Sequence, residues 1–510
     1  MTSNHSLHGG LDQEVEAATD RAVELVPSIW DRDHTVWQDD PGEVANRLGW
    51  LDCPTAFAER TNELDDFASG VVDDGIEHVL LVGMGGSSLY PDVLARTQGA
   101  SSGYPQLHVL DSTHPAAVVR ITETLPWDRT LVIASSKSGT TVETRSHLDH
   151  FWTVLREEHG EDAGRFVGAV TDPGSALEQL GEEHGFRRVF ANPPDIGGRF
   201  SALSYFGLVP AALLGVDVAA HLHSGRQMRE ACQQDSRDNP GAFLGAAMAA
   251  AEQAGRDKLT LVLPDEVTAF GDWVEQLVAE STGKGGRGLL PVVGEPIGAP
   301  QVYGDDRLFV VYGEHDGIDA LAEAGHPVVR LPALGPDRLG AEVFRWEFAT
   351  AVCGALLDLN PFDQPNVASA KQATSRVLEQ GMPALETVDP ESLLGTVGAG
   401  DYVAILAYVD PWSGTVEALR EAAIRLRDRL QVPVTLGVGP RYLHSTGQLH
   451  KGGPDTGVFL VVLGDLDTDE SIPGRVYSFG ELIRAQAAGD LEALQGEGLR
   501  AGLVEADALT

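Results

Sequence analysis

The segment 135-SSKSGTTVET-144 carries residue types that can hold a phosphate group. It follows the apolar run 131-LVIA-134, which predicts a buried parallel strand that turns into a helix. Hydroxyl groups and free backbone N–H groups at the start of a helix, together with the positive end of its dipole, bind phosphate dianions. A second turn, 83-GMGGSSL-89, follows the apolar run 78-HVLLV-82. Two such turns about fifty residues apart indicate a sugar-phosphate site rather than a nucleotide site.

Two of the glycine-rich segments also fit other interpretations when each is taken alone. The turn at 83–89 fits a plain tight turn or a dinucleotide site, although Ser88 stands where G-x-G-x-x-G would have its third glycine. In 193-PPDIGGRFSALS-204, Arg199 follows two glycines. Backbone without side chains can approach a ligand closely, and a guanidinium can clamp an anion. A surface loop with an incidental arginine is the alternative.

The segment 275-EQLVAESTGKGGRGLLPV-292 offers a candidate base. Glu280 stands near the end of an apolar helix, and a carboxylate sheltered there can act as a general base with a raised pKa. In so acidic a chain, a solvated surface charge is the other interpretation. The segment 360-NPFDQPNVASAK-371 predicts a proline-bounded turn and a helix that carries Gln364 and, two turns on, Lys371.

The segment 439-GPRYLHSTGQLHKGGPDTG-457 is glycine-rich and contains His444, His450 and Lys451. A single histidine is more often structural than catalytic, and two beside a lysine shift this balance only slightly. No H-E-x-x-H or Cys/His ligand spacing occurs, so no metal is expected. The three cysteines are far apart in the sequence, which favours free thiols in a reducing compartment.

The net charge of −40 argues against partners such as nucleic acids and anionic membranes. No apolar run reaches the roughly 18–20 residues of a membrane span. The acidic first twenty residues lack the apolar core of a signal peptide, so we expect a cytoplasmic protein. Of the five lysines, four lie in the segments described above. The acidic surface fits either a salty cytoplasm or a genome rich in G and C.

The order of strand-like and helix-like stretches predicts an α/β protein with doubly wound parallel sheets. We divide the chain into a helical lead-in (1–75), a first α/β subdomain (76–256), a second one (257–383) and a C-terminal α/β extension (384–510). The predicted strands are 78–82, 107–111, 131–134, 166–172, 188–190, 259–264, 289–293, 308–312, 327–331, 402–408, 433–439 and 457–463.

Taken in order, GMGGSSL, SSKSGTTVET, GGRFSALS, AESTGKGGRG and NPFDQPNVASAK resemble motifs of the glucose-6-phosphate isomerase (phosphoglucose isomerase) family. The run 48-LGWLDCP-54 and the segment 439–457 resemble most the isomerase half of bacterial transaldolase–glucose-6-phosphate isomerase fusions. No transaldolase half is expected in a chain of this length. The resemblance implies two sugar-isomerase (SIS-type) α/β subdomains, with parallel-sheet cores flanked by helices.

The resemblance also implies roles for particular residues. Glu280 matches the base that moves a proton between C1 and C2 through a cis-enediolate, and Arg199 matches the cation that stabilises this enediolate. Lys371 matches the lysine near the ring oxygen. The substrate-binding groups that the resemblance implies, with the phosphate on the hydroxyls and on the backbone N–H groups of Lys137 and Gly139, are Gly86, Ser87, Ser136, Lys137, Ser138, Gly139, Thr141, Gly198 and Gln364.

The ring-opening histidine departs from the family pattern, which places it between the glutamate and the lysine. His315 and His326 lie in that interval without the family's context, whereas 444-HSTGQ-448 has a similar context but follows Lys371. We therefore expect His444 in this role, with His450 and His326 as alternatives. Because the family draws this histidine from the neighbouring subunit, we expect a homodimer with active sites at the subunit interface.

The resemblance predicts an aldose–ketose isomerase of glycolysis and gluconeogenesis. It would interconvert glucose 6-phosphate and fructose 6-phosphate, with a small-molecule sugar phosphate as its partner and no cofactor. One alternative is an isomerase of broader specificity that also accepts mannose 6-phosphate. Another is a non-catalytic sugar-phosphate sensor, which the joint presence of Glu280, Arg199 and Lys371 disfavours because a sensor needs no base.

Overall fold

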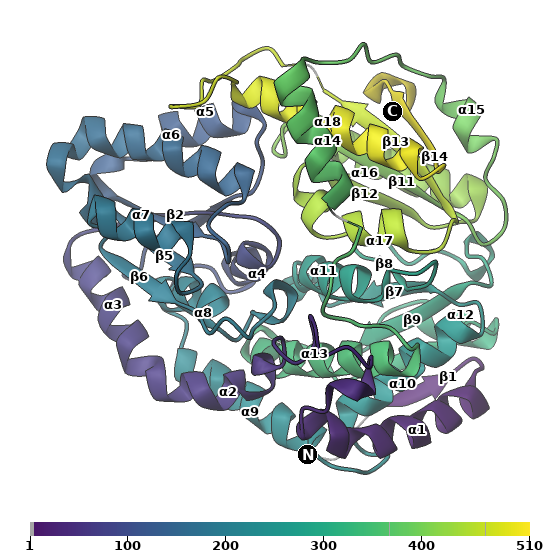
Figure 1. The fold of residues 1–510 in the computed structure, drawn as a ribbon. Coiled ribbons are helices and arrows are strands. Elements are labelled where there is room, and N and C mark those ends of the chain that lie inside the picture. Colours follow the sequence, from purple (N-terminus) through teal and green to yellow (C-terminus); the bar gives the residue numbers. More distant parts are fainter. Residues whose placement is uncertain (1–4, 367, 465) are drawn as a thin grey trace.

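The computed structural model describes residues 5–366, 368–464 and 466–510. The chain forms three sheets, each covered by helices (Figure 1). All strand pairs within them are parallel except that of β1 (Ser6–His8) with β10 (Val328–Leu331). This arrangement confirms the predicted α/β class with parallel-sheet cores.

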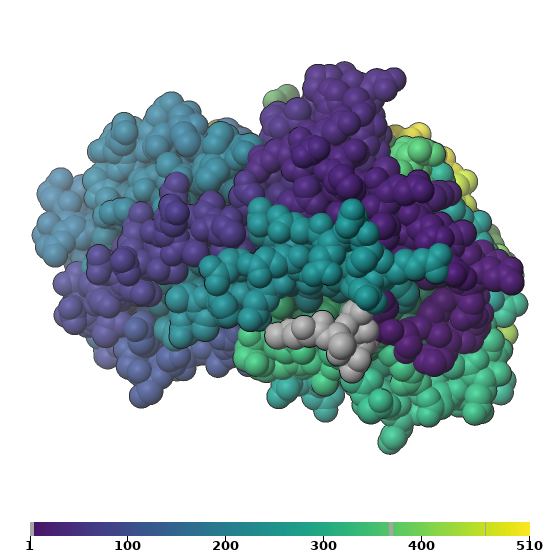
Figure 2. All heavy atoms as spheres, turned by 90° about the horizontal axis from the view of Figure 1, so that it is seen from below, coloured from purple at the N-terminus to yellow at the C-terminus, as the bar shows by residue number. Residues whose placement is uncertain are grey.

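The N-terminal segment contributes a strand as well as the predicted helices. Strand β1 pairs antiparallel with β10 at the edge of the second sheet. The helices that follow are α1 (Asp12–Trp30), α2 (Cys53–Ala56) and α3 (Thr61–Asp73). Figure 2 shows this segment in purple, spread over one face beside teal residues from the middle of the chain, in agreement with the contacts of α1 with α10 and of α2 with α9.

The first sheet has the order β3-β2-β4-β5-β6. Its strands agree with the predicted ones to within two residues, because buried parallel strands have nearly continuous apolar sequences. All six residues of β4 are buried. The elements are β2 (His78–Gly83), α4 (Leu89–Thr97), β3 (Gln106–Leu110), α5 (Pro115–Thr124), β4 (Thr130–Ser135), α6 (Val142–His159), β5 (Val167–Thr171), α7 (Ala176–His184) and β6 (Arg188–Ala191).

The second sheet has the order β1-β10-β9-β7-β8. Every residue of α13 (Leu339–Leu356) is buried, and this helix packs on α9, α10 and α11. The remaining elements are α8 (Tyr205–Leu213), α9 (Val218–Cys232), α10 (Pro240–Gln253), β7 (Lys258–Val262), α11 (Phe270–Thr282), β8 (Leu290–Val292), β9 (Arg307–Tyr312) and α12 (Ile318–Glu323).

The C-terminal segment forms a third sheet, with the order β12-β11-β13-β14. Helix α14 (Ala368–Gln380) packs on α18, although we grouped it with the second subdomain, and β14 (Arg500–Val504) was not predicted. The domain limits themselves stay a prediction. The other elements are α15 (Pro390–Leu394), β11 (Tyr402–Tyr408), α16 (Gly414–Leu430), β12 (Val434–Val438), α17 (Gly447–Gly452), β13 (Gly457–Leu463) and α18 (Phe479–Gly496).

The carboxyl ends of parallel strands are where α/β proteins place their ligand-binding loops. The predicted site segments follow this rule at β2 and β4, and the histidine-bearing segment follows β12. Among the described residues, no helix is both long and apolar enough to cross a membrane.

Candidate active site

Glu280 lies near the C-terminal end of α11 and is buried. Its Oε2 accepts hydrogen bonds from Nε2 of Gln364 at 3.0 Å and, more weakly, from Nε2 of Gln276 at 3.4 Å. Burial raises the pKa of Glu280 to about 7, against the opposing effects of Arg199 and His444. The carboxylate can therefore exchange a proton near neutral pH.

Arg199 is buried beside Glu280, in a single 3₁₀ turn (Gly198–Phe200). Its guanidinium donates to the backbone oxygen of Glu280 at 2.9 Å and to those of Pro361 and Asp363 at 3.1 Å each. Nη1 lies 3.9 Å from the Glu280 carboxylate. Because carbonyl groups take up these hydrogens without neutralising the charge, the arginine remains a fixed cation at the carboxylate.

Lys284 is a residue of this site that the sequence analysis did not select. Its Nζ donates to the backbone oxygen of Asn360 at 2.7 Å and to Oδ1 of Asp363 at 2.6 Å. Burial lowers the pKa of Lys284 to about 8, and the nearby Arg199 contributes to this lowering. Lys284 and Arg199 together fix the loop from which Gln364 reaches Glu280. Gln364 lies in the turn before α14, not on the helix as predicted.

The serine-threonine turn (residues 136–141) joins β4 to α6, as predicted. Oγ of Ser136 lies 3.1 Å from Oγ1 of Thr141, and the backbone N–H of Gly139 donates to Ser136 Oγ. Oγ of Ser138 lies 2.8 Å from Oγ1 of Thr140. Gly139 has φ +70°, and a Cβ there would lie 2.4 Å from the backbone N of Leu177. The turn therefore gathers four hydroxyls at the start of α6 and requires glycine at its tip.

The side chain of Lys137 points away from this turn. Its Nζ lies 2.5 Å from Oδ2 of Asp172 and donates to the backbone oxygens of Pro194 and Ile196 at 3.0 Å each. Only the backbone of Lys137 belongs to the turn, and the use of its N–H group for phosphate binding stays a prediction. The side chain connects the turn to the segment that leads to Arg199.

The glycine turn (residues 83–89) contacts the turn that carries Arg199 and the turn that carries His444. A Cβ on Gly86 would lie 2.0 Å from the backbone oxygen of Gly198, so these two predicted glycines are in direct contact. A Cβ on Gly85 would lie 3.0 Å from the backbone oxygen of His444. Ser87 closes the 3₁₀ turn at Gly85–Ser87 by donating its N–H to Met84.

His444 ends the 3₁₀ turn at Arg441–His444, which follows β12. Its Nε2 lies 3.0 Å from Oε1 of Glu143, and its backbone oxygen accepts from Gln276 Nε2 at 2.6 Å. Glu143 is buried near the start of α6 and also accepts from Gln486 at 2.8 Å. Burial opposes ionisation of Glu143, but the neighbouring His444 helps to hold its pKa below the ordinary value. Glu143 stands inside the segment 135–144, yet its sequence context gave no sign of a histidine partner.

His444 approaches Glu280 of its own chain. We expected this histidine in the partner subunit's site, but the C-terminal segment folds back so that the turn at 441–444 contacts α11 and the glycine turn. The charge of His444 acts on the Glu280 carboxylate, since it limits the rise of that carboxylate's pKa. One chain thus places His444 near its own Glu280, and the expected homodimer stays a prediction.

The two alternative histidines occupy aromatic surroundings. His450 is buried between Tyr402 and Phe459, with Nδ1 3.0 Å from the Tyr402 hydroxyl, and burial lowers its pKa to about 3. His326 packs against Tyr303 and Phe309 in the second sheet's core. Burial among aromatic rings is typical of structural histidines.

The remaining predicted residues line two cavities. Lys371, an exposed residue of α14, lines a cavity of about 430 Å³ together with Ser138, Thr141, Glu143 and His444. A second cavity of about 420 Å³ is lined by Gly198, Arg199, Lys137 and Gln364. Residues that line both cavities act on Glu280. Gln364 and Arg199, which line the second cavity, lie at its carboxylate. His444, which lines the first, limits the rise of its pKa.

Comparison with protein families matches residues 6–287, more than half of the chain, to the family described as phosphoglucose isomerase. This protein belongs to the phosphoglucose isomerase family. The expected resemblance to this family and the expectation of an isomerase are thereby confirmed, whereas the closer likeness to the isomerase half of transaldolase fusions stays a prediction.

Relatives of known name agree with this family assignment. The chain is 31% identical over 378 residues to glucose-6-phosphate isomerase from Rubrobacter xylanophilus, a match that covers 61% of this chain and 84% of the relative. It is 29% identical to an enzyme of the same name from Thermus thermophilus, with coverage of 66% and 91%.

Solved structures support the fold. A hypothetical protein from Thermus thermophilus superposes with a TM-score of 0.64 at 28% identity, covering 73% of this chain and 99% of that one. A glucose-6-phosphate isomerase from Chlamydia trachomatis gives 0.63 at 18% identity, covering 74% and 88%, and bears on the fold alone.

The contact between Gly86 and Gly198 generates a test of the site's architecture. We expect Gly86→Ala to lower the free energy of unfolding by about 1–3 kcal/mol, because the added methyl group must displace backbone. Urea unfolding measures the change, and the exposed Gly414, where an added Cβ meets nothing within 4 Å, provides the control Gly414→Ala. Unchanged stability of Gly86→Ala would show that the two turns do not pack as described.

Proposed function

We propose that this protein interconverts glucose 6-phosphate and fructose 6-phosphate, in glycolysis and gluconeogenesis. The observation that carries the proposal is Glu280, a buried carboxylate whose pKa lies near 7 and which faces the guanidinium of Arg199. The names of the relatives give glucose 6-phosphate as the substrate of an isomerase, and its ketose isomer is fructose 6-phosphate. The reaction is a proton shift within one molecule, so the proposal includes no cofactor or metal.

The phosphate group of the substrate is assigned to the two turns. Ser136, Ser138 and Thr141 provide hydroxyl donors at the start of α6, with the backbone N–H groups of Lys137 and Gly139. Ser87 of the glycine turn lies at the carboxyl end of β2, beside β4 in the same sheet. Charge-assisted hydrogen bonds at a helix N-terminus fix the phosphate and thereby orient the sugar.

Ring opening is assigned to His444 and Lys371. As the bond between C1 and the ring oxygen breaks, the ring oxygen gains a proton and the hydroxyl on C1 loses one. The contact between Nε2 and Oε1 of Glu143 orients the imidazole of His444. Lys371 lines the same cavity and offers a cation near the ring oxygen.

Isomerisation is assigned to Glu280. The carboxylate removes the proton from C2, and the electron pair left behind forms the C1–C2 double bond of a cis-enediolate. The hydroxyl proton on O2 passes to O1, and protonated Glu280 returns its proton to C1 as the carbonyl group forms at C2. Arg199, held by three carbonyl groups, offsets the negative charge that develops on the substrate oxygens without having to reorganise.

Removal of the base provides the first test of the mechanism. We expect Glu280→Gln to lower kcat by about 10²–10⁴-fold while substrate still binds, because glutamine keeps the size of the side chain but cannot accept a proton. Coupled assays and substrate-binding measurements check this, with the exposed Glu266→Gln as the control. Retention of more than a tenth of the wild-type rate would exclude Glu280 as the base.

The pH profile follows from the same residue. The base must be ionised, and burial raises the pKa of Glu280 to about 7. We therefore expect kcat/KM of the wild-type protein to fall as pH decreases through about 7, nearly tenfold for each pH unit below it. A profile that stays flat down to pH 5 would contradict an elevated pKa.

The serine-threonine turn is tested by the double variant Ser136→Ala/Thr141→Ala. Each lost charge-assisted hydrogen bond costs on the order of 1.5–3 kcal/mol, so KM should rise at least about tenfold. Thr153→Ala, which removes an exposed hydroxyl from the same helix α6, is the matched control. An unchanged KM in the double variant would make the turn structural.

Subunit mixing tests whether the site belongs to one chain. Because Glu280 and His444 meet within a chain, mixtures of Glu280→Gln and His444→Ala chains should stay inactive under conditions of subunit exchange. Recovery of roughly a quarter of wild-type activity, as expected for random dimers in which one hybrid site regains both residues, would instead show that a partner supplies the histidine.

A further inference from the structure

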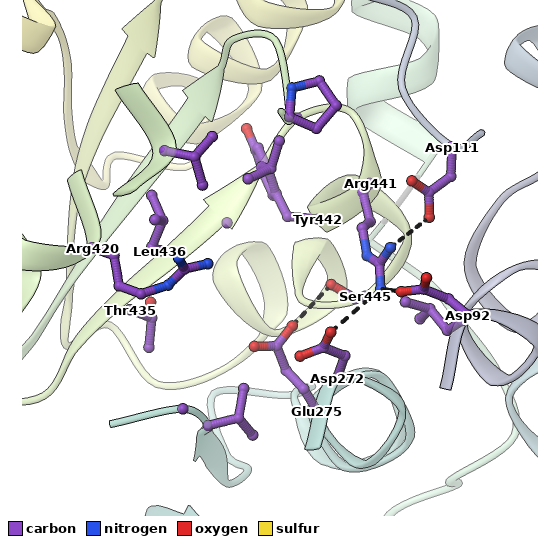
Figure 3. Close-up of a pocket in the computed structure, with 18 of the residues that line it drawn as sticks. Asp92, Asp111, Asp272, Glu275, Arg420, Thr435, Leu436, Arg441, Tyr442 and Ser445 are labelled. Atoms are coloured by element: carbon purple, nitrogen blue, oxygen red, sulfur yellow. Dashed lines mark hydrogen bonds and ion pairs between the residues drawn. The ribbon is translucent and has the colours of Figure 1, made fainter. Parts of the chain in front are cut away.

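A cavity of about 700 Å³ lies on the other side of the turn that carries His444. Figure 3 shows Arg441, the first residue of that turn, pointing at three aspartates. Its Nη2 lies 2.9 Å from Oδ2 of Asp92 and 3.5 Å from Oδ2 of Asp272, and its Nη1 lies 3.0 Å from Oδ2 of Asp111. We call these four residues the Arg441 cluster.

The three aspartates come from three different elements of the two sugar-isomerase subdomains. Asp92 lies on α4, Asp111 follows β3, and Asp272 lies on α11. Asp111 also accepts from the hydroxyl of Ser88 in the glycine turn, at 3.3 Å. The Arg441 cluster thus attaches the C-terminal extension to both subdomains at one point.

Helix α11 makes two further contacts with the same short stretch. Glu275 accepts from the hydroxyl of Ser445 at 3.1 Å, and Gln276 donates to the backbone oxygen of His444 at 2.6 Å. The helix that carries Glu280 therefore holds both the last residue of the histidine turn and the residue after it. The distance between base and histidine depends on these contacts.

An arginine suits this position because its planar guanidinium presents several donors in fixed directions. A lysine would keep the charge but act as a single point, and could not reach three carboxylates with the same geometry. Arg96, at the cavity's edge, also pairs with Asp272 at 2.7 Å and with Asp92 at 3.4 Å, so these aspartates retain a cation when Arg441 changes.

We propose that Arg441 is a positioning residue for His444, which it holds at the ring-opening position within its own chain. This inference rests on the proposed role of His444. It predicts that damage to the Arg441 cluster affects ring opening and leaves the later proton transfer by Glu280 nearly intact.

The experiment compares two substrates and two backgrounds. One substrate is glucose 6-phosphate, and the other is an analogue without the hydroxyls on C4 and C5, which cannot close a ring. The variant Arg441→Lys is made in the wild-type and in the His444→Ala protein. Arg420→Gln is the matched control, because Arg420 lines the same cavity but pairs with Glu417 on α16.

With glucose 6-phosphate, we expect Arg441→Lys to lower kcat at least tenfold and to change KM less than threefold. With the open analogue, kcat should fall less than threefold. In the His444→Ala background, Arg441→Lys should cause less than a twofold further loss, because two changes that act through one group are not additive. Arg420→Gln should match the wild type.

Equal losses on both substrates, or equal losses in both backgrounds, would overturn the proposal and give Arg441 a merely structural role. Failure of the proposed function would look different, because the wild-type protein itself would then not turn over glucose 6-phosphate. Normal turnover by His444→Ala would instead exclude His444 from ring opening and overturn the proposal. If Arg441→Lys does not fold, Asp272→Asn, at a partly exposed member of the cluster, must show the same pattern at smaller amplitude.

Discussion

The burial of the Glu280 carboxylate beside Arg199 is the constraint on which the rest of the site depends. A carboxylate and a guanidinium removed from water are stable only when their hydrogen-bonding groups find other partners. Here the backbone oxygens of Glu280, Pro361 and Asp363 accept hydrogen bonds from Arg199. The side chains of Gln364 and Gln276 donate hydrogen bonds to the Glu280 carboxylate. Both subdomains and the loop at 360–363 must therefore meet at this point.

The C-terminal extension completes the arrangement by placing His444 against Glu143 and α11. Glu143 and His444 are 301 residues apart in the sequence. Gln486 on α18 donates a hydrogen bond to Glu143 as well. The extension thus contributes to the site directly and is more than an addition to the surface. The family pattern places the ring-opening histidine between the glutamate and the lysine, whereas His444, our candidate, follows Lys371 and lies in a segment with its own sheet.

The sequence predicted what depends on local pattern. Apolar strands such as β4 were identified because a buried strand has a local apolar pattern. Gly86 and Gly198 came from the family resemblance, and the structure shows that they touch. Four of the five lysines were tied to site segments. In the structure Lys371 and Lys451 line one cavity, Lys137 lines the other, and Lys284 lies beside Glu280. Three of these lysines pair with carboxylates: Lys137 with Asp172, Lys284 with Asp363 and Lys451 with Asp490.

What the sequence could not predict depends on distant partners. The partnership of Glu143 with His444 follows from how the third sheet docks, and the contacts of Lys284 follow from where the loop at 360–363 lies. The sequence carries no periodic signal for docking. The expectation of a histidine supplied by a partner came from the family and not from the residues. The short strands β1 and β14 also lacked a pattern of their own, because their pairing with β10 and β13 defines them.

The protonation of Glu280 in the folded protein is the most direct test of this account. Carbon-13 NMR of protein labelled at the glutamate side-chain carboxyls, with the Glu280 signal assigned by its absence in Glu280→Gln, would give its titration midpoint without substrate. The account predicts a midpoint at about pH 7. A midpoint near 4.5, the ordinary value for a glutamate, would mean that the carboxylate is solvated and that the buried site described here is wrong.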